Sequence, residues 1–319
     1  MSVSKKPHII MTGCSGFVGN NLLMKLCESG YKISTLNRKK SLVSFQHKSV
    51  SHYYADDFAI ALEDALKNSS CDVFIHLAGA AHKPELTESD YLKVNVELTK
   101  YLARKAAMLG CKRFIQLSSI GVNGSSSSTP FTASDIPAPK ESYSRSKYLA
   151  EQEIQAICAS SDMEYVIIRP PLIYGPFAPG NFQKLVRLVK KTPIIPMGGI
   201  DNQRSFVSIY NLISFIEVTI EHPNAANEVF LVSDEQDIST SDFVNKIISS
   251  YKQRTLLISL PWSILRPALK LIGKEKALEK ITSNVTIEMN KSISLLDWKP
   301  PLTIEESLEK SAFHESNKI

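Results

Sequence analysis

The sequence has few cysteines, no long hydrophobic run and no segment dominated by charge of one sign, and each absence excludes a class of protein. The five cysteines are Cys14, Cys27, Cys71, Cys111 and Cys158. None forms a Cys-x-x-Cys pair, so no metal site is expected, and their apolar neighbours predict reduced, buried thiols. No apolar run approaches the roughly 20 residues of a membrane-spanning helix, so no membrane span is expected. The first apolar run begins at residue 8, which leaves no room for a signal peptide and predicts a cytoplasmic location.

Charge is nearly balanced along the chain. The 319 residues include 37 lysines and arginines and 32 aspartates and glutamates, which gives a net charge of +5. Because the basic residues are spread over the whole chain in short clusters, we expect no nucleic-acid partner. Binding of small anionic ligands is enough to account for the slight excess of basic residues. Hydrophobic residues at 43% and charged residues at 22% are typical of a globular protein, and the length allows one large domain or two modest ones.

Three glycines, Gly13, Gly16 and Gly19, separate an apolar run at residues 8–10 from a segment with helical spacing. This order predicts a strand, a tight turn and a helix, which is how a dinucleotide-binding Rossmann unit begins. The first glycine permits the turn, the second lets the backbone approach a pyrophosphate, and the third lets helix and strand pack closely. Free amides in the first helical turn, which includes Phe17 and Val18, would bind the phosphates. A glycine triplet alone could also be an ordinary surface turn.

A carboxylate is missing where an NAD-binding unit places one. In such units an acidic residue after the second strand accepts a hydrogen bond from the adenosine ribose. No Asp or Glu occurs between Gly30 and Gln46, and Asn37 and Arg38 stand there instead. Their donors would suit a 2′-phosphate, so NADP is preferred over NAD as the cofactor. A solvated basic loop is the alternative interpretation.

Strands and helices alternate over the first half of the chain, which predicts a doubly wound parallel sheet. The expected strands are residues 31–36, 50–54, 72–77, 113–117, 165–169 and 230–233, in addition to the first. We expect a Rossmann domain at residues 1–174 with 203–236, and a smaller, mainly helical substrate lobe at residues 175–202 with 237–319. Residues 256–272 are interpreted as a core-facing helix of that lobe, with a membrane-surface helix as the alternative.

A Tyr-x-x-x-Lys pair, Tyr143 with Lys147, opens the helix expected at residues 142–159. The spacing places both side chains on one helical face. Tyr101 and Lys105 have the same spacing, so location must distinguish the two pairs. Ligands of an open α/β sheet bind beyond the carboxyl ends of the strands, where helices begin. Tyr143 lies in the first turn of its helix and follows a strand that ends near Ser119, whereas the other pair lies toward the far end of its helix.

These three residue types form a proton-transfer device for interconverting alcohols and carbonyls. A phenol with a pKa near 10 is a poor base at neutral pH. We expect the Lys147 ammonium to lower the pKa of the Tyr143 phenol into the range where acid and base catalysis is efficient. Ser119 would donate a hydrogen bond to the substrate oxygen.

With these motifs in place, the chain resembles the extended short-chain dehydrogenases of the NAD-dependent epimerase/dehydratase family over nearly its whole length. The matching pieces are Thr12-Gly13 with Gly16 and Gly19, His76-Leu77-Ala78, Asn95, Ser118-Ser119, Tyr143 to Lys147, and Arg169-Pro170-Pro171 with Tyr174-Gly175-Pro176. The resemblance implies a cofactor site made by Gly13, Gly16, Phe17, Val18, Gly19, Asn37, Arg38, Asp56, Asp57, Ala78, Asn95, Tyr143, Lys147 and Pro170. It also implies a nucleotide-sugar substrate whose pyrophosphate meets Asn181 and Arg204, and a possible homodimer.

Two departures from the family pattern reduce the number of reactions that this chain is expected to catalyse. Dehydratases of this family carry an Asp-Glu pair directly after the catalytic serine or threonine, where this chain has Ile120 and Gly121. Asn123 stands where the epimerases commonly have a tyrosine. In this segment the chain resembles bacterial reductases. The favoured expectation is therefore a 4-keto reductase of a UDP-4-keto-6-deoxy-N-acetylhexosamine in surface polysaccharide biosynthesis. The alternative is a UDP-hexose or UDP-N-acetylhexosamine 4-epimerase with tightly bound NAD, and a remote one is a non-catalytic dinucleotide-sensing regulator.

Overall fold

The core of the molecule is a seven-stranded sheet in which every neighbouring pair is parallel. The computed structural model describes residues 6–39, 43–67, 70–80, 85–260 and 281–317. The strand order is β10-β6-β5-β4-β1-β2-β3. Their bounds are β1 (His8–Thr12), β2 (Lys32–Arg38), β3 (Val50–Ala55), β4 (Val73–His76), β5 (Arg113–Leu117), β6 (Glu164–Arg169) and β10 (Glu228–Leu231). The predicted doubly wound Rossmann sheet is confirmed, and its strand order reverses between β1 and β4, where such sheets bind ligands.

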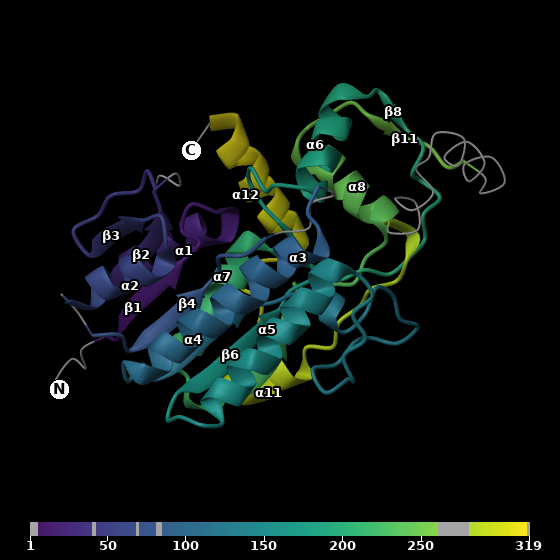
Figure 1. Ribbon diagram of the computed structural model, residues 1–319. Coiled ribbons are helices and arrows are strands. Elements are labelled where there is room, and N and C mark those ends of the chain that lie inside the picture. Colours follow the sequence, from purple (N-terminus) through teal and green to yellow (C-terminus); the bar gives the residue numbers. More distant parts are fainter. Residues whose placement is uncertain (1–5, 40–42, 68–69, 81–84, 261–280, 318–319) are drawn as a thin grey trace.

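Helices cover both faces of this sheet, as Figure 1 shows. One face carries α1 (Phe17–Glu28) and α7 (Ile209–Glu221), and the other carries α2 (Phe58–Lys67), α4 (Leu98–Met108) and α5 (Ser142–Cys158). Alternate residues of a strand supply the two cores: Ile9 packs toward α1, and Ile10 packs toward α2. Burial on both faces explains why the central strands β1 and β4 are rich in apolar residues.

A smaller unit at the carboxyl edge is built mainly from α6 (Asn181–Lys191), α8 (Thr240–Ser250) and α12 (Ile304–Asn317). Two pairs of short parallel strands support it: β7 (Leu172–Tyr174) with β9 (Phe206–Ser208), and β8 (Ile194–Ile195) with β11 (Leu256–Leu257). The segment containing α11 (Asn290–Leu296) instead packs into the core under α7, where Trp298 meets Phe215 edge to face. The boundary between the two predicted domains stays a prediction.

The structure differs from the sequence-based expectation in two places. The helix expected at residues 88–109 consists of α3 (Glu88–Tyr91), a π-helical turn (Leu92–Glu97) and α4. The four short strands β7, β8, β9 and β11 were missed, because two or three residues give no readable alternation. Most of the helix interpreted at residues 256–272 lies outside the described residues. Within the described part of the chain, no helix is long and apolar enough to cross a membrane.

Candidate active site

The glycine turn after β1 has the steric features of a phosphate cradle. Gly13 adopts a left-handed conformation with φ of +79°, and a Cβ there would lie 2.6 Å from the Ala78 amide nitrogen. A Cβ on Gly19 would overlap the Gly13 carbonyl oxygen, so α1 can approach the turn only with glycine at that position. Gly16 is the N-cap of α1 and offers no side chain to its first amides, which include those of Phe17 and Val18. These amides fit a pyrophosphate group.

The structure brings Ser119 and Tyr143 together at the carboxyl edge of the sheet. Ser119 follows β5, Tyr143 lies in the first turn of α5, and the Ser119 side chain lies close enough to the Tyr143 phenol to affect its pKa. The Gly121 amide donates to Ser119 Oγ over 3.2 Å, which fixes the serine at the start of a short 3₁₀ turn. A Cβ on Gly121 would overlap Ser144 Oγ, so a larger residue here would require the Ser144 side chain to turn away.

Lys147 lies one turn after Tyr143 on α5 and is buried. Burial lowers the pKa of its ammonium to about 8, although the nearby Glu151 carboxylate acts in the opposite direction. Burial also raises the pKa of the Tyr143 phenol to about 12, which outweighs the hydrogen bond from Ser119. The structure therefore does not show the lowered phenol pKa that the sequence led us to expect, because the cost of burying a phenolate dominates.

A buried ion pair anchors α5 to the sheet on the side of the catalytic residues. Arg169 at the end of β6 donates Nη2 to Glu151 Oε2 over 2.6 Å and Nε to Oε1 over 3.0 Å. Its Nη1 donates to Asn123 Oδ1 over 2.9 Å, and Ser118 Oγ also donates to Glu151. The sequence analysis missed this network, although Glu151 follows Lys147 by four residues and so shares its helical face.

Asn95 lies in the π-helical turn and joins the loop after β4 to α5. Its Oδ1 accepts a hydrogen bond from the Ala80 amide over 2.7 Å, and its Nδ2 donates to Ser146 Oγ over 3.0 Å. Ser146 in turn donates to the carbonyl oxygen of Tyr143 over 2.7 Å. Asn95 thus holds the start of α5, which carries Tyr143 and Lys147, and the irregular turn that carries Asn95 is a feature often found at functional sites.

His76 belongs to the same buried polar layer. Its Nδ1 lies 2.7 Å from Thr12 Oγ1, and its Nε2 lies 3.0 Å from Thr99 Oγ1. Burial lowers the pKa of this imidazole to about 3, so the ring is neutral at physiological pH. His76 is therefore a core residue whose two ring nitrogens lie within hydrogen-bond distance of threonine hydroxyls.

The residues predicted to hold the adenosine end lie at the tips of β2 and β3. Asn37 is buried and donates its amide to Thr35 Oγ1 over 2.7 Å. Arg38, the last residue of β2, is exposed. Asp56 pairs with Lys39 over 3.0 Å, and Asp57 lies immediately before α2. Of these four residues, Arg38 is therefore the one whose side chain can donate hydrogen bonds to a phosphate.

The remaining predicted residues surround the same edge. The Ala78 amide donates to Thr12 Oγ1 over 3.3 Å, and Pro170 accepts a hydrogen bond from the Ile120 amide over 2.9 Å beside Ser119. Asn181 is exposed at the start of α6. Arg204 donates Nη1 to the Ser283 carbonyl over 3.2 Å, and burial lowers its pKa. No described contact joins Asn181 or Arg204 to the catalytic residues, so their roles stay predictions.

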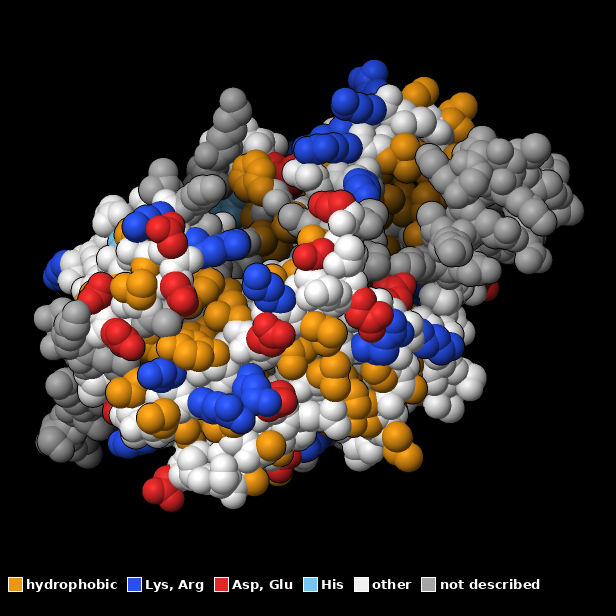
Figure 2. Space-filling model, in the orientation of Figure 1, with side chains coloured by type: hydrophobic (Ala, Val, Ile, Leu, Met, Phe, Trp, Pro, Cys, Tyr) orange, Lys and Arg blue, Asp and Glu red, His pale blue; other side chains and the backbone are white. Residues whose placement is uncertain are grey.

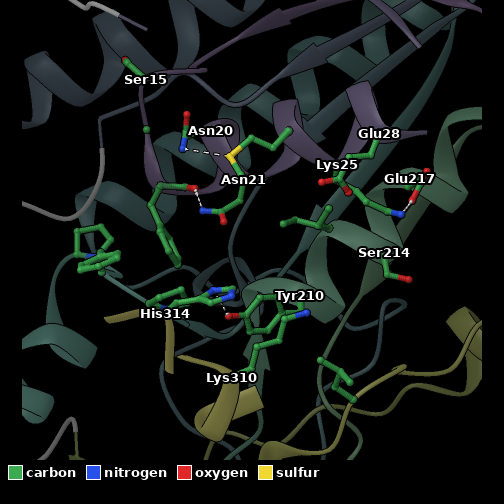
Figure 3. Close-up of a pocket in the computed structure, with 18 of the residues that line it drawn as sticks. Ser15, Asn20, Asn21, Lys25, Glu28, Tyr210, Ser214, Glu217, Lys310 and His314 are labelled. Atoms are coloured by element: carbon green, nitrogen blue, oxygen red, sulfur yellow. Dashed lines mark hydrogen bonds and ion pairs between the residues drawn. The ribbon is translucent and has the colours of Figure 1, made fainter. Parts of the chain in front are cut away.

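A cavity of about 1060 Å³ opens between α1, α7 and α12. Figure 3 shows the side chains of Tyr210 and His314 meeting in it, where they form a hydrogen bond of 3.2 Å. Its charges are mixed: Lys25 pairs with Glu217 over 3.6 Å, and Lys310 lies over the Tyr210 ring. Gly16 and Phe17 of the glycine turn line one end of this cavity, whereas Ser119, Tyr143 and Lys147 do not line it.

The lowered pKa of Lys147 predicts a pH limit for turnover. The ammonium is charged below pH about 8 and neutral above it, so kcat should fall as the pH rises through 8. In Lys147→Arg the cation persists above pH 12, so the loss of kcat near pH 8 should disappear even if kcat itself is lower. Measuring kcat from neutral to alkaline pH checks this, and an unchanged alkaline limit in Lys147→Arg would assign that limit to another group.

Comparisons with known proteins agree with this geometry. A model of the NAD dependent epimerase/dehydratase family matches residues 9–233. The chain is 37% identical to a UDP-glucose 4-epimerase of Vibrio cholerae over 95% of its own length and 94% of the relative. It shares its fold with a UDP-glucuronic acid 4-epimerase from Bacillus cereus in complex with NAD, at a TM-score of 0.78 and 18% identity over 97% and 99% of the two chains. It also shares its fold with the UDP-glucose 4-epimerase from Thermotoga maritima with UDP-glucose, at a TM-score of 0.77 and 19% identity over 98% of this chain and 99% of the other.

Proposed function

This chain belongs to the NAD dependent epimerase/dehydratase family, and from that premise we propose that it is a nucleotide-sugar 4-epimerase. The observation that carries the proposal is the placement of the Ser119 side chain beside the Tyr143 phenol, with Lys147 one turn further along α5. The proposal takes the alternative of the sequence analysis over the favoured reductase, because the relative at 37% identity is an epimerase.

Each residue of the centre has a definite task in such a reaction. NAD, when bound at the glycine turn, supplies the acceptor and donor of hydride. As a phenolate stabilised by the Lys147 ammonium, Tyr143 would take the proton of the sugar 4-hydroxyl during oxidation, and as the resulting phenol it would return that proton to the 4-oxygen during reduction. Ser119 donates a hydrogen bond to the same oxygen. Because the configuration at C4 depends on the face that receives hydride, whereas the proton always returns to the 4-oxygen, one acid and base serves both directions.

The case for the reductase is weakened by the surroundings of Asn123. This residue favoured a reductase because epimerases commonly have tyrosine there. It is buried, accepts from Arg169 over 2.9 Å and donates to the Thr132 carbonyl over 2.8 Å. Its identity therefore follows from packing. The missing ribose carboxylate after β2 still favours exchangeable NADPH, so the 4-keto reductase remains the second candidate.

Incubation with single nucleotide sugars tests the two candidates. The epimerase should equilibrate UDP-glucose with UDP-galactose, or their N-acetyl forms, without net change in the absorbance of reduced cofactor. Tyr143→Phe serves as the matched control for contaminating activity. Stoichiometric oxidation of NADPH by a UDP-4-keto-6-deoxy-N-acetylhexosamine, with no epimerisation, would establish the reductase instead.

We infer NAD as the cofactor of the epimerase, and the 2′-phosphate preference predicted from β2 is tested at Arg38. In Arg38→Ala the dissociation constant of NADPH should rise about tenfold or more and that of NADH should change little, because only NADPH brings a phosphate to the guanidinium. Lys39→Ala is the control, since the Lys39 ammonium is already paired with Asp56. Fluorescence titration measures both dissociation constants. Equal losses of affinity for NADPH and NADH would mean that Arg38 does not contact the 2′-phosphate.

We also propose a homodimer formed by α4 and α5 in the cytoplasm. The two helices lie side by side on the outer face of the sheet (Figure 1) and expose Met108 and Leu149. All five cysteines are buried without disulfides, which fits a reducing compartment. Light scattering of the purified chain, compared with Leu149→Arg, tests the dimer.

A further inference from the structure

One face of the smaller unit combines exposed cations with exposed apolar side chains. Helix α6 buries Phe182, Val186 and Val189 against the rest of the unit. The opposite side of the helix exposes three cations at helical spacing, Lys184, Arg187 and Lys191. None of the three forms an ion pair with another described residue. Lys190, by contrast, is already held by Glu315 over 2.8 Å and by the Tyr251 ring.

Apolar side chains adjoin these cations. Leu188 on α6 is 39% exposed, and the paired strands β8 and β11 present Ile194 at 49% and Leu256 at 59% directly opposite one another. The Thr255 hydroxyl donates to the Val189 carbonyl over 2.6 Å, which fixes this strand pair at the end of α6. Figure 2 shows basic side chains over α6 with hydrophobic ones beside them over β8 and β11. We call Lys184, Arg187, Leu188, Lys191, Ile194, Arg254 and Leu256 the α6 face.

The two segments that supply this face contain no acidic residue: no Asp or Glu occurs from residue 165 to 200 or from residue 243 to 260. The carboxylate of Glu315 on α12 pairs with Lys190 and not with the three exposed cations of α6. The charged side chains of these two segments are therefore all basic. A nucleic acid would use the cations but leave the apolar side chains in water. A bilayer surface takes both, because anionic headgroups attract the cations while leucine and isoleucine enter the acyl boundary.

We propose that the α6 face docks this protein on a membrane surface rich in anionic phospholipid. Contact is peripheral: the cations meet headgroup phosphates, and Leu188, Ile194 and Leu256 enter the interface. The catalytic centre lies at the carboxyl edge of the sheet on other elements, so docking is compatible with an open active site. The proposal does not depend on which sugar the enzyme converts.

Co-sedimentation of the full-length protein with vesicles tests the proposal. The protein should pellet with phosphatidylcholine vesicles that contain about a third phosphatidylglycerol, remain in solution with pure phosphatidylcholine, and release as salt is raised. The triple variant Lys184→Gln, Arg187→Gln, Lys191→Gln should bind about a hundredfold more weakly, at roughly fivefold for each cation lost. The pair Ile194→Ser, Leu256→Ser should also weaken binding, because both side chains are exposed and their loss leaves the core intact.

A matched control removes the same charge from the opposite edge of the sheet. Lys32, Lys48 and Lys112 are exposed near the amino ends of β2, β3 and β5, and their triple glutamine variant should bind like the wild type. Equal losses in the two triple variants would reduce the effect to net charge and overturn the proposal. Absence of binding to anionic vesicles by a wild-type protein with a normal melting temperature would also overturn it. Loss of self-association without loss of vesicle binding in the α6 variants would assign the face to a second copy of the chain.

Discussion

Replacing Tyr143 with phenylalanine is expected to lower turnover by about two to four orders of magnitude while leaving the fold and dinucleotide binding intact. The change deletes one hydroxyl, which lies beside the Ser119 side chain, and keeps the ring that packs edge to face against Tyr91. Because the phenol pKa is raised to about 12, the wild-type enzyme holds this proton firmly at neutral pH and needs the lysine charge as it leaves. Steady-state kinetics and a cofactor titration measure the two effects separately.

The chain contains a matched control for this substitution. Tyr101 and Lys105 have the same spacing on α4, and the Lys105 ammonium lies 5.9 Å from the centre of the Tyr101 ring. This pair lies on a helix away from Ser119, so Tyr101→Phe should change turnover by less than about twofold. Equal losses in the two variants, or no loss in either, would remove Tyr143 from the catalytic role.

The parts of the fold that were predictable from sequence depend on local rules. Gly13 and Gly19 mark a turn whose backbone and helix contact tolerate no side chain, and the structure shows the overlaps that enforce this. The central strands β1 and β4 are buried on both faces, as a parallel sheet between two helical layers requires, whereas the edge strand β3 is mostly exposed or half-buried. Tyr143 was distinguished from Tyr101 by its place in the first turn of a helix at the carboxyl edge, which needs only the alternation of strands and helices.

What could not be predicted depends on contacts between distant segments. The π-helical turn around Asn95 is stabilised by Ala80 and by Ser146 on α5, and none of these pairings leaves a signal in the spacing of one helix. The direction of the Tyr143 pKa shift follows from burial, which the sequence does not give. Asn123 was read as a sign of reaction type, whereas the structure explains it as a partner of Arg169.

Breaking the Arg169–Glu151 pair is expected to cause the largest loss of stability. Both side chains are nearly inaccessible, at 4% and 1% exposure, and two hydrogen bonds of 2.6 and 3.0 Å join them. Arg169→Met should lower the free energy of unfolding by about 3–5 kcal/mol, because it removes the guanidinium that donates to both oxygens of the buried Glu151 carboxylate. Urea denaturation of the two proteins measures the difference.

Two comparisons distinguish the buried charge from a general effect of removing arginine. Arg145 pairs with Glu88 at 3.5 Å on the surface, where the side chains are 43% and 58% exposed, so Arg145→Met should cost less than about 1 kcal/mol. The double variant Arg169→Met, Glu151→Leu should recover part of the loss, because it removes the orphaned carboxylate along with its partner. A loss in Arg169→Met no larger than in Arg145→Met would show that the pair does not anchor α5. A double variant less stable than Arg169→Met would show that Glu151 stabilises the fold through Ser118 rather than through the arginine.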